Sequence, residues 1–450
     1  MPINSRLGKK MELDIQRLGI NGEGVGSWYG CTIFVDGALP LEKVYASLYE
    51  KKKNYGRAYL LNIIEPSPDR VDPVCPLFGR CGGCQIMHMT YESQLSNKRQ
   101  RVVDALERIG KFKDLHVEEC MPSPQPLAYR NKIQIPVAAS DQGIRLGLYA
   151  RNSHDLIDMK KCYIHCDLGE KVYHSIQEII KSSSLHGFDF KTGKGELKHL
   201  LIKTAVATQQ VLVILVSAQM PTTQIVEMAK KIINDNPSVK GVIHNYNPEQ
   251  SNTVLGNLYT TLAGDDAIED VLCGLKVKVS PASFFQVNPL QAEALYAHCI
   301  VNSEVTSMDT VLDAYCGVGT MSLLFAQKAK KVIGVEVVHE AIVDAIHNAK
   351  NNRIDNVEFY AAAVEEYISK VDENIDILVL NPPRKGCDPS VIEKIDSLNL
   401  KKIVYISCDP ATLARDLHLL SLQGWKIQKV QPFDMFPQTA HVETLVTLSK

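Results

Sequence analysis

The last third of the chain alternates between short apolar runs and helical segments, and this rhythm limits its fold more than any other feature. Five apolar runs predict strands, and three amphipathic segments predict helices. Such alternation predicts a parallel sheet covered by helices on both faces, with a ligand at the carboxyl ends of the strands. The predicted strands are 311–315, 331–337, 356–361, 375–380 and 402–407, and the predicted helices are 319–329, 339–351 and 410–422.

Residues 1–65 predict a small β-barrel. Five short strand-like runs separated by glycine turns fit this length, and closing the sheet removes its exposed edges. A basic run, Lys51-Lys52-Lys53, lies near Tyr55 and Arg57. It has two interpretations: a solvated hairpin tip, or a loop that holds a nucleic-acid strand by phosphate contacts and base stacking.

Residues 66–270 predict a β-rich central domain. A linker at 66–69 precedes a cysteine cluster, the segment 93–110 predicts a basic helix, and 128–221 is mostly strand-like. At 450 residues the chain is long enough for about three domains. The third is the α/β domain, over 271–450.

Composition excludes several classes of protein. With 45% hydrophobic and 22% charged residues, the chain is typical of a globular protein, not a disordered one. No apolar stretch approaches the roughly 18 residues that span a membrane. Twelve cysteines in 450 residues are too few for a disulfide scaffold, so clustered cysteines indicate metal binding or catalysis in a reducing compartment. We therefore expect a cytoplasmic protein without a membrane partner.

A glycine turn at 313–320 predicts a cofactor site. It follows a predicted strand and contains Gly317 and Gly319, and glycines there let a cofactor approach the backbone. The third glycine of the dinucleotide fingerprint is missing. Glu336 ends the next strand, about 20 residues after Gly317, where a carboxylate meets a ribose diol. These residues favour S-adenosylmethionine; the alternative is a structural turn, which leaves Glu336 unexplained.

Three further residues predict the chemistry at the same edge of the sheet. Cys408 ends the fifth strand just before a helix, whose N-terminus stabilises a thiolate, so it is a candidate nucleophile. Glu443 begins an apolar run and is a candidate general base. The alternatives are a small core cysteine and a solvent-facing glutamate. Asn381 opens Asn-Pro-Pro-Arg at the end of the fourth strand, which raises amino-group methylation as an alternative; Arg384 in place of an aromatic residue counts against it.

Three thiols lie within a ten-residue, glycine-rich loop: those of Cys75, Cys81 and Cys84. Three thiols this close together strongly indicate a metal site. Spacing alone does not select the fourth ligand. The candidates are Cys120, Cys162 and Cys166, with a zinc site completed by His88 or His165 as the alternative.

Five motifs in order resemble the bacterial RNA 5-methyluridine methyltransferase family. They are Gln286-Val-Asn-Pro, Asp313-x-Tyr-Cys-Gly-x-Gly, Asn381-Pro-Pro-Arg-Lys-Gly, Ser407-Cys-Asp-Pro-Ala-Thr-Leu-Ala-Arg-Asp and His441-Val-Glu-Thr. The resemblance covers nearly the whole chain. It implies a Rossmann-like class I methyltransferase domain, an N-terminal TRAM-type, OB-like barrel that helps bind RNA, and a segment 91–127 that packs with the catalytic domain.

The resemblance also implies roles for single residues. It makes Cys408 the nucleophile and Glu443 the base. Its cofactor contacts fall on Gln286, Tyr315, Glu336 and Asn381. An aspartate is usual where this chain has Asn381, so a role requiring negative charge is in doubt. It selects Cys162 as the fourth ligand of a [4Fe-4S] cluster.

The implied function is S-adenosylmethionine-dependent methylation of uridine C5 in RNA by a monomeric enzyme. We expect 23S rRNA as the substrate, because family members with both a barrel and a cluster usually act on ribosomal RNA. The alternatives are 5-methyluridine formation in tRNA, amino-group methylation, and an RNA-binding or redox protein with an inactive methyltransferase domain.

Overall fold

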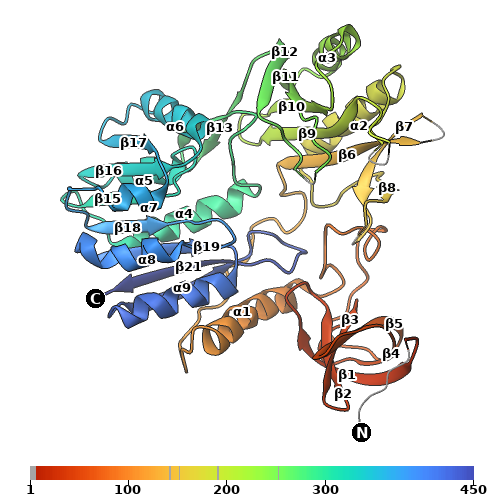
Figure 1. Ribbon diagram of the computed structural model, residues 1–450, viewed down its shortest axis with the longest axis horizontal. Helices are drawn as coiled ribbons and strands as arrows, with labels where there is room; N and C mark the ends of the chain where they lie inside the picture. The colour runs from red at the N-terminus through yellow and green to blue at the C-terminus, as the bar shows by residue number, and fades with distance from the viewer. Residues whose placement is uncertain (1–6, 141–142, 152, 190–191, 252) are drawn as a thin grey trace.

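The computed structural model describes residues 7–140, 143–151, 153–189, 192–251 and 253–450. Figure 1 shows a small barrel at one end of the chain, a central sheet, and a larger sheet flanked by helices that ends at the C-terminus. This arrangement confirms the predicted fold class: a barrel, a β-rich central part and an α/β part. The domain boundaries at residues 65 and 270 stay predictions.

The N-terminal strands close into the predicted barrel, in the order β1-β2-β3-β5-β4. Alternation along β1 explains why it forms: Met11, Leu13 and Ile15 are buried, and the residues between them face solvent. The strands are β1 (Lys10–Leu18), β2 (Gly24–Trp28), β3 (Cys31–Asp36), β4 (Lys43–Lys51) and β5 (Tyr55–Glu65).

The central part is a seven-stranded sheet, in the order β12-β11-β10-β9-β6-β7-β8. Helix α2 (Asp167–Lys181) lies within the stretch expected to be mostly strands. Its buried Val172, Ile176 and Ile180 have helical spacing, but β-branched residues also favour strands. The remaining elements are β6 (Lys132–Ser140), β7 (Gly143–Tyr149), β8 (Leu156–Asp158), β9 (Leu197–Ala205), β10 (Gln210–Ser217), α3 (Thr223–Asp235), β11 (Val239–Tyr246) and β12 (Leu258–Gly264).

The C-terminal sheet has the order β17-β16-β15-β18-β19-β21-β20, in which β15 to β19 are parallel, β21 is antiparallel to β19, and β20 is antiparallel to β21 and so runs in the direction of the parallel strands. Its strands are β15 (Thr310–Ala314), β16 (Lys331–Glu336), β17 (Val357–Ala361), β18 (Ile377–Leu380), β19 (Lys402–Ser407), β20 (Lys426–Phe433) and β21 (Glu443–Ser449). Its helices are α4 (Pro289–Ser303), α5 (Thr320–Ala326), α6 (His339–Asn351), α7 (Val364–Ile368), α8 (Pro389–Ile395), η1 (Asp396–Leu398) and α9 (Pro410–Leu422), and the hairpin of β13 (Ile268–Leu272) and β14 (Leu275–Val279) precedes them.

This topology places the predicted site residues at one edge. The order of the strands along the chain reverses between β15 and β18. Open α/β sheets bind ligands at such a reversal. Because β21 runs antiparallel to β19, its first residue lies beside the carboxyl end of β19.

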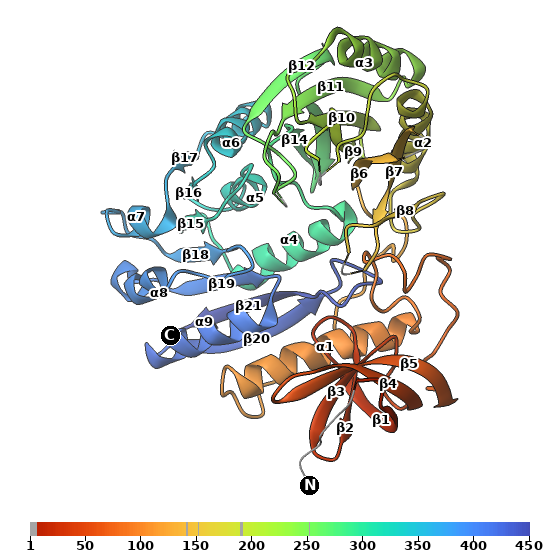
Figure 2. The ribbon, with the colours of Figure 1, turned by 45° about the vertical axis from the view of Figure 1, so that its right-hand side comes forward.

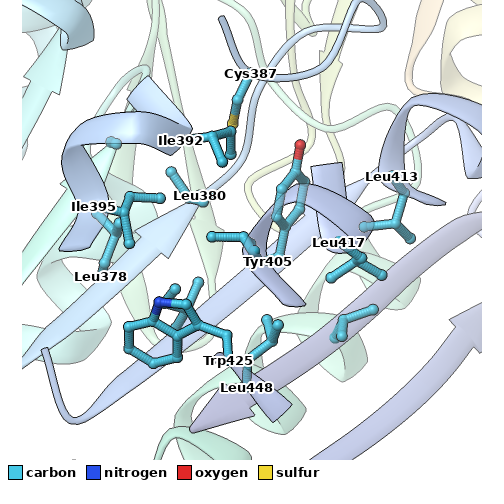
Figure 3. Close-up of a cluster of buried hydrophobic side chains, with 14 of the residues drawn as sticks. Leu378, Leu380, Cys387, Ile392, Ile395, Tyr405, Leu413, Leu417, Trp425 and Leu448 are labelled. Atoms are coloured by element: carbon cyan, nitrogen blue, oxygen red, sulfur yellow. The ribbon is translucent and has the colours of Figure 1, made fainter. Parts of the chain in front are cut away.

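Helix α1 (Tyr91–Arg108) lies between the barrel and the C-terminal sheet (Figure 2). Its Val102 and Leu106 are buried in the same apolar cluster as Tyr405 of β19. Figure 3 shows part of that cluster, where residues of α8 and α9 meet the sheet. Within the described ranges, no helix is both long and apolar enough to cross a membrane.

Candidate active site

Cys408 and Glu443 lie at neighbouring ends of two paired strands. Cys408 follows Ser407, the last residue of β19, and Ser407 pairs with Thr444 of β21. Glu443 is the residue just before Thr444, so strand pairing brings the predicted nucleophile and the predicted base together. The Cys408 side chain is half-buried, whereas Glu443 is only 6% exposed.

Burial changes the acidity of Glu443. Removal from water raises its pKa to about 8, and the positive charge of Arg384 opposes that rise. A carboxyl group with this pKa is a better match for proton transfer near neutral pH than a solvated glutamate. The solvent-facing alternative for Glu443 is therefore wrong for this structure.

The acidity of Cys408 differs from the expectation. Burial, and then the Glu443 carboxylate, raise the pKa of its thiol to about 11, while the Arg384 guanidinium lowers it. The N-terminus of α9 does not offset this rise, because the Asp409 carboxylate already accepts hydrogen bonds from the amides of Ala411 and Thr412 at 2.9 and 3.1 Å. The free thiol thus has a raised pKa, whereas the sequence predicted a thiolate stabilised by the helix N-terminus.

The glycine turn forms a cradle at the end of β15. Gly317 has φ +55°, and a Cβ placed on it meets no atom within 4 Å, so the backbone is open to a ligand on that side. The Glu336 carboxylate accepts hydrogen bonds from the Gly317 amide at 3.2 Å and the Val338 amide at 3.0 Å. Tyr315 lies beside them with a left-handed φ of +68°, a conformation that costs energy outside glycine.

Gln286 and Asn381 flank this cradle from two other elements. The Gln286 side chain hydrogen-bonds the buried phenol of Tyr296, and its backbone carbonyl accepts from Asn131 at 3.0 Å. Asn381 follows β18, and its amide donates to the carbonyl of Ala314, the last residue of β15, at 3.4 Å. The structure thus gathers the predicted cofactor contacts at the carboxyl edge of the sheet.

The cysteine loop, residues 75–90, lines a cavity of about 1210 Å³. Cys75, Cys81, Cys84 and Cys162 all line it. Burial, followed by the charges of the three other thiols, raises the pKa of Cys84 well above its usual range, in keeping with thiols that face one another. No group of three or more His, Cys, Asp or Glu side chains in the described part of the chain is arranged to hold a single metal ion.

The other candidates for a fourth ligand lie elsewhere or are occupied. Cys120 is buried in the core of the C-terminal sheet, and the Cys166 thiol hydrogen-bonds Thr204. His165 lines the cavity, but its Nδ1 lies 2.6 Å from Glu170 Oε1. His88 packs against Phe78, with 4.8 Å between the ring centroids.

The basic run of the barrel forms the hairpin between β4 and β5, and most of its charges have partners within the barrel. The Lys51 ammonium donates to the Cys31 sulfur at 2.7 Å, and Lys52 lies 3.0 Å from Glu50. Arg57 lies 3.4 Å from Glu23.

Phe284, two residues before Gln286, is 68% exposed, as a stacking platform for a base requires.

Sequence reasoning missed a buried ion pair between helix α1 and the segment before Glu443. The Lys98 ammonium donates to the Asp434 carboxylate, and both side chains are at most 1% exposed. The sequence predicts a basic helix over 93–110, and the charged face of such a helix is usually solvated. The available signal was position: Lys98 lies one helical turn before the core residue Val102, on the same face of α1.

Comparison with known proteins places this architecture in a family. Residues 275–450 match the protein family described as tRNA (Uracil-5-)-methyltransferase. An "Uncharacterized RNA methyltransferase" of Clostridium tetani is 42% identical over 97% of this chain and 95% of the relative, and one of Listeria innocua is 40% identical over 98% of each.

Among solved structures, a crystal structure of the Pyrococcus abyssi tRNA (uracil-54, C5)-methyltransferase in complex with S-adenosyl-L-homocysteine is similar to this fold. The TM-score is 0.77 and the sequence identity 25%, over 97% of this chain and 100% of that one. The matched domain, the relatives that match end to end and the similar solved structure agree: the chain belongs to the RNA uracil-5-methyltransferase family.

Proposed function

We propose that the protein transfers a methyl group from S-adenosylmethionine to C5 of a uridine in RNA, through a covalent bond between Cys408 and C6 of the base. The observation that carries the proposal is the pairing of β19 with β21, which sets a thiol beside a buried carboxyl group. Both lie at the sheet edge that holds the open glycine turn.

The reaction needs these two groups in sequence. Uracil C5 is a poor nucleophile, so the Cys408 sulfur adds to C6 and the ring becomes an enolate whose C5 attacks the methyl group. The thiol loses its proton to solvent as it adds, and the positive charge of Arg384 favours the anion. The Glu443 carboxylate then removes the C5 proton, and the freed electron pair restores the C5–C6 double bond and expels the sulfur.

The residues of the glycine turn fit S-adenosylmethionine. When bound, it supplies an electrophilic methyl group. Glu336 is placed to accept from a ribose diol, and the open face of Gly317 lets the cofactor approach the backbone. Tyr315, Gln286 and Asn381 complete the proposed contacts, and Asn381 acts as a neutral hydrogen-bonding group because it carries no charge.

We also propose that Cys75, Cys81, Cys84 and Cys162 ligate a [4Fe-4S] cluster. Four thiols that line one cavity support this. Zinc, with Zn–S bonds of ~2.3 Å, is the alternative, and no group of three or more described side chains is arranged to hold a single ion. Each cysteine of a cluster binds a different iron, so its ligands lie farther apart. Methyl transfer requires no electron, so the role proposed for the cluster is structural.

For the substrate we propose 23S rRNA, because a barrel and a cysteine cluster occur together in this chain. A second candidate is tRNA, favoured by the similarity over 97% of the chain to a structure whose protein is a tRNA uracil-54 methyltransferase. If the chain acts on uridine 54 of tRNA, it should methylate a tRNA transcript. It should not methylate a transcript in which cytidine replaces uridine 54.

A methyl-transfer assay tests the function. Tritium-labelled S-adenosylmethionine is incubated with unmodified 23S rRNA or with tRNA transcripts, and the product is digested to nucleosides. We expect label in 5-methyluridine from 23S rRNA only. Label in 5-methyluridine from tRNA only would replace the substrate, and label in a methylated amino group of adenosine or cytidine would contradict C5 methylation.

A further inference from the structure

The segment 434–442 connects β20 to β21 and ends one residue before Glu443, so we call it the base-bearing segment. It forms neither helix nor strand, yet all of its residues except Phe436 and His441 are buried. A buried irregular segment leaves backbone groups without partners unless other parts of the chain supply them.

Four side chains from three separate places supply these partners. Helix α1 provides two of them, which lie on the face of the helix that meets the sheet. The carbonyl oxygens that accept are those of Met435 (from Asn288, 3.2 Å), Phe436 (from Lys98, 3.1 Å), Pro437 (from Tyr129, 3.1 Å) and Ala440 (from Arg101, 2.5 Å).

Gln438 lies at the centre of this network. Its backbone carbonyl accepts from the amides of Gln85 at 3.1 Å and Ile86 at 3.2 Å, both in the cysteine loop. Its amide donates to the Gln94 side chain of α1 at 3.1 Å, and its own side-chain oxygen accepts from the Gln94 amide group at 3.1 Å. Its side-chain nitrogen donates to the Pro126 carbonyl at 3.3 Å.

The backbone of Gln438 is held in an unfavourable conformation. Its φ is +70°, in the left-handed region that glycine and asparagine adopt more easily than glutamine. Such a conformation persists where surrounding interactions outweigh its cost, and it is common near functional sites. Here the reciprocal bonds with Gln94 and the two amides of the cysteine loop maintain it.

We propose that Gln438 is a positioning residue for proton removal: it joins helix α1 and the cysteine loop to the base-bearing segment and thereby sets the place of Glu443 relative to Cys408. The inference rests on the proposed function. A base must lie within hydrogen-bond reach of the proton that it removes, and small displacements of a reacting group lower rates steeply. Cys408 follows β19, which also pairs with β18, a strand outside this network.

The proposal therefore predicts a loss confined to one step. In Gln438→Ala, addition of Cys408 and methyl transfer should stay within about 3-fold of wild type, while tritium release from C5-labelled uridine should slow by roughly 10- to 100-fold. Methylated RNA bound covalently to the protein should then accumulate, as a labelled band of low mobility in a denaturing gel.

Gln94→Ala removes the same reciprocal bonds from the side of α1 without changing the base-bearing segment, and it should give the same phenotype. The double variant should be no slower than the slower single variant, because both substitutions break one set of interactions. Gln431→Ala is the matched control: Gln431 is a buried glutamine of β20 whose side chain donates to Glu119 at 2.6 Å and not to the base-bearing segment. It should accumulate no adduct.

If methyl incorporation and tritium release slow equally in Gln438→Ala and no adduct accumulates, Gln438 has only a structural role. That result would overturn the proposal. Wild-type rates in both Gln438→Ala and Gln94→Ala, or adduct in Gln431→Ala as well, would also overturn it. Two controls test the proposed function separately, since wild type must form 5-methyluridine and Glu443→Gln must accumulate adduct. Their failure would contradict the reaction itself and not the role of Gln438.

Discussion

Cys408 follows the last residue of β19, and Glu443 is the first residue of the antiparallel neighbour β21. The proposed nucleophile and the proposed base therefore come from two paired strands, and the segment that precedes Glu443 is itself buried. The Glu443 carboxylate also affects the ionisation of its neighbour, because it raises the pKa of the Cys408 thiol.

Cys408→Ala should lower methyl transfer by at least ~10³-fold, as expected when a nucleophile is removed. Binding of S-adenosylmethionine should remain near the wild-type level, because the thiol acts on the uracil. Equilibrium dialysis and the methyl-transfer assay measure the two properties. Cys273→Ala, at a half-buried cysteine on the β13–β14 turn, is the control and should stay active. Full activity of Cys408→Ala would contradict the covalent mechanism.

Glu443 should make stability depend on pH. Its pKa is about 8 in the folded protein, against a usual value of 4.5, so the folded state holds a proton that the unfolded state has lost. Stability from this group is present below pH 4.5 and falls as pH rises to about 8, by up to about 5 kcal/mol. Glu443→Gln removes this dependence.

Thermal unfolding of wild type and Glu443→Gln at about pH 5 and about pH 9 measures the effect. The melting temperature of the variant relative to wild type should rise with pH. A difference that does not change with pH would mean that Glu443 is not buried in its uncharged form.

The cysteine cavity makes a prediction about metal content. Protein purified without oxygen should contain about four iron atoms and as many sulfide ions per chain, since four thiolates ligate such a cluster. Cys81→Ser should lose most of this iron, whereas Cys31→Ser, at a barrel cysteine that contacts Lys51, should retain it. Stoichiometric zinc without iron would contradict the proposal.

Within the barrel, Lys52 and Lys53 are both exposed at the turn between β4 and β5, but Lys52, like Lys51 and Arg57, has a described partner. If Lys53 contacts a phosphate of single-stranded RNA, Lys53→Ala should lower the slope of log affinity against log salt by about 0.7. Lys231→Ala, on helix α3, is the control with a positive charge outside the barrel. An unchanged slope for Lys53→Ala would return the hairpin to the solvated interpretation.

The local hydrophobic pattern predicted much of the fold, because the residues of the C-terminal helices and strands favour the structure that they adopt. Helix 339–351, strand 402–407 and helix 410–422 have the predicted bounds. Helix α2 was not predicted, because its buried face is rich in isoleucine. Isoleucine by itself favours strands, and only the tertiary packing makes this segment helical.

The site could be predicted in its residues but not in its energetics. Strand ends identified Cys408 and Glu443, but the raised pKa of each depends on burial and on the neighbouring strand. The pair of Lys98 with Asp434 joins residues more than 300 positions apart, so no local pattern indicates it. The hydrogen bond between Gln94 and Gln438 also joins residues far apart in the sequence, so no local pattern predicts it.

The most direct test of the central claim uses Glu443→Gln with methyl-labelled S-adenosylmethionine and substrate RNA. Glutamine keeps the shape of the side chain but cannot accept the C5 proton, so addition and methyl transfer should proceed and elimination should stop. A denaturing gel should then show a protein–RNA band that carries the methyl label and is absent when Cys408→Ala is combined with Glu443→Gln. Wild-type turnover by Glu443→Gln, or a labelled band that persists without Cys408, would contradict the account.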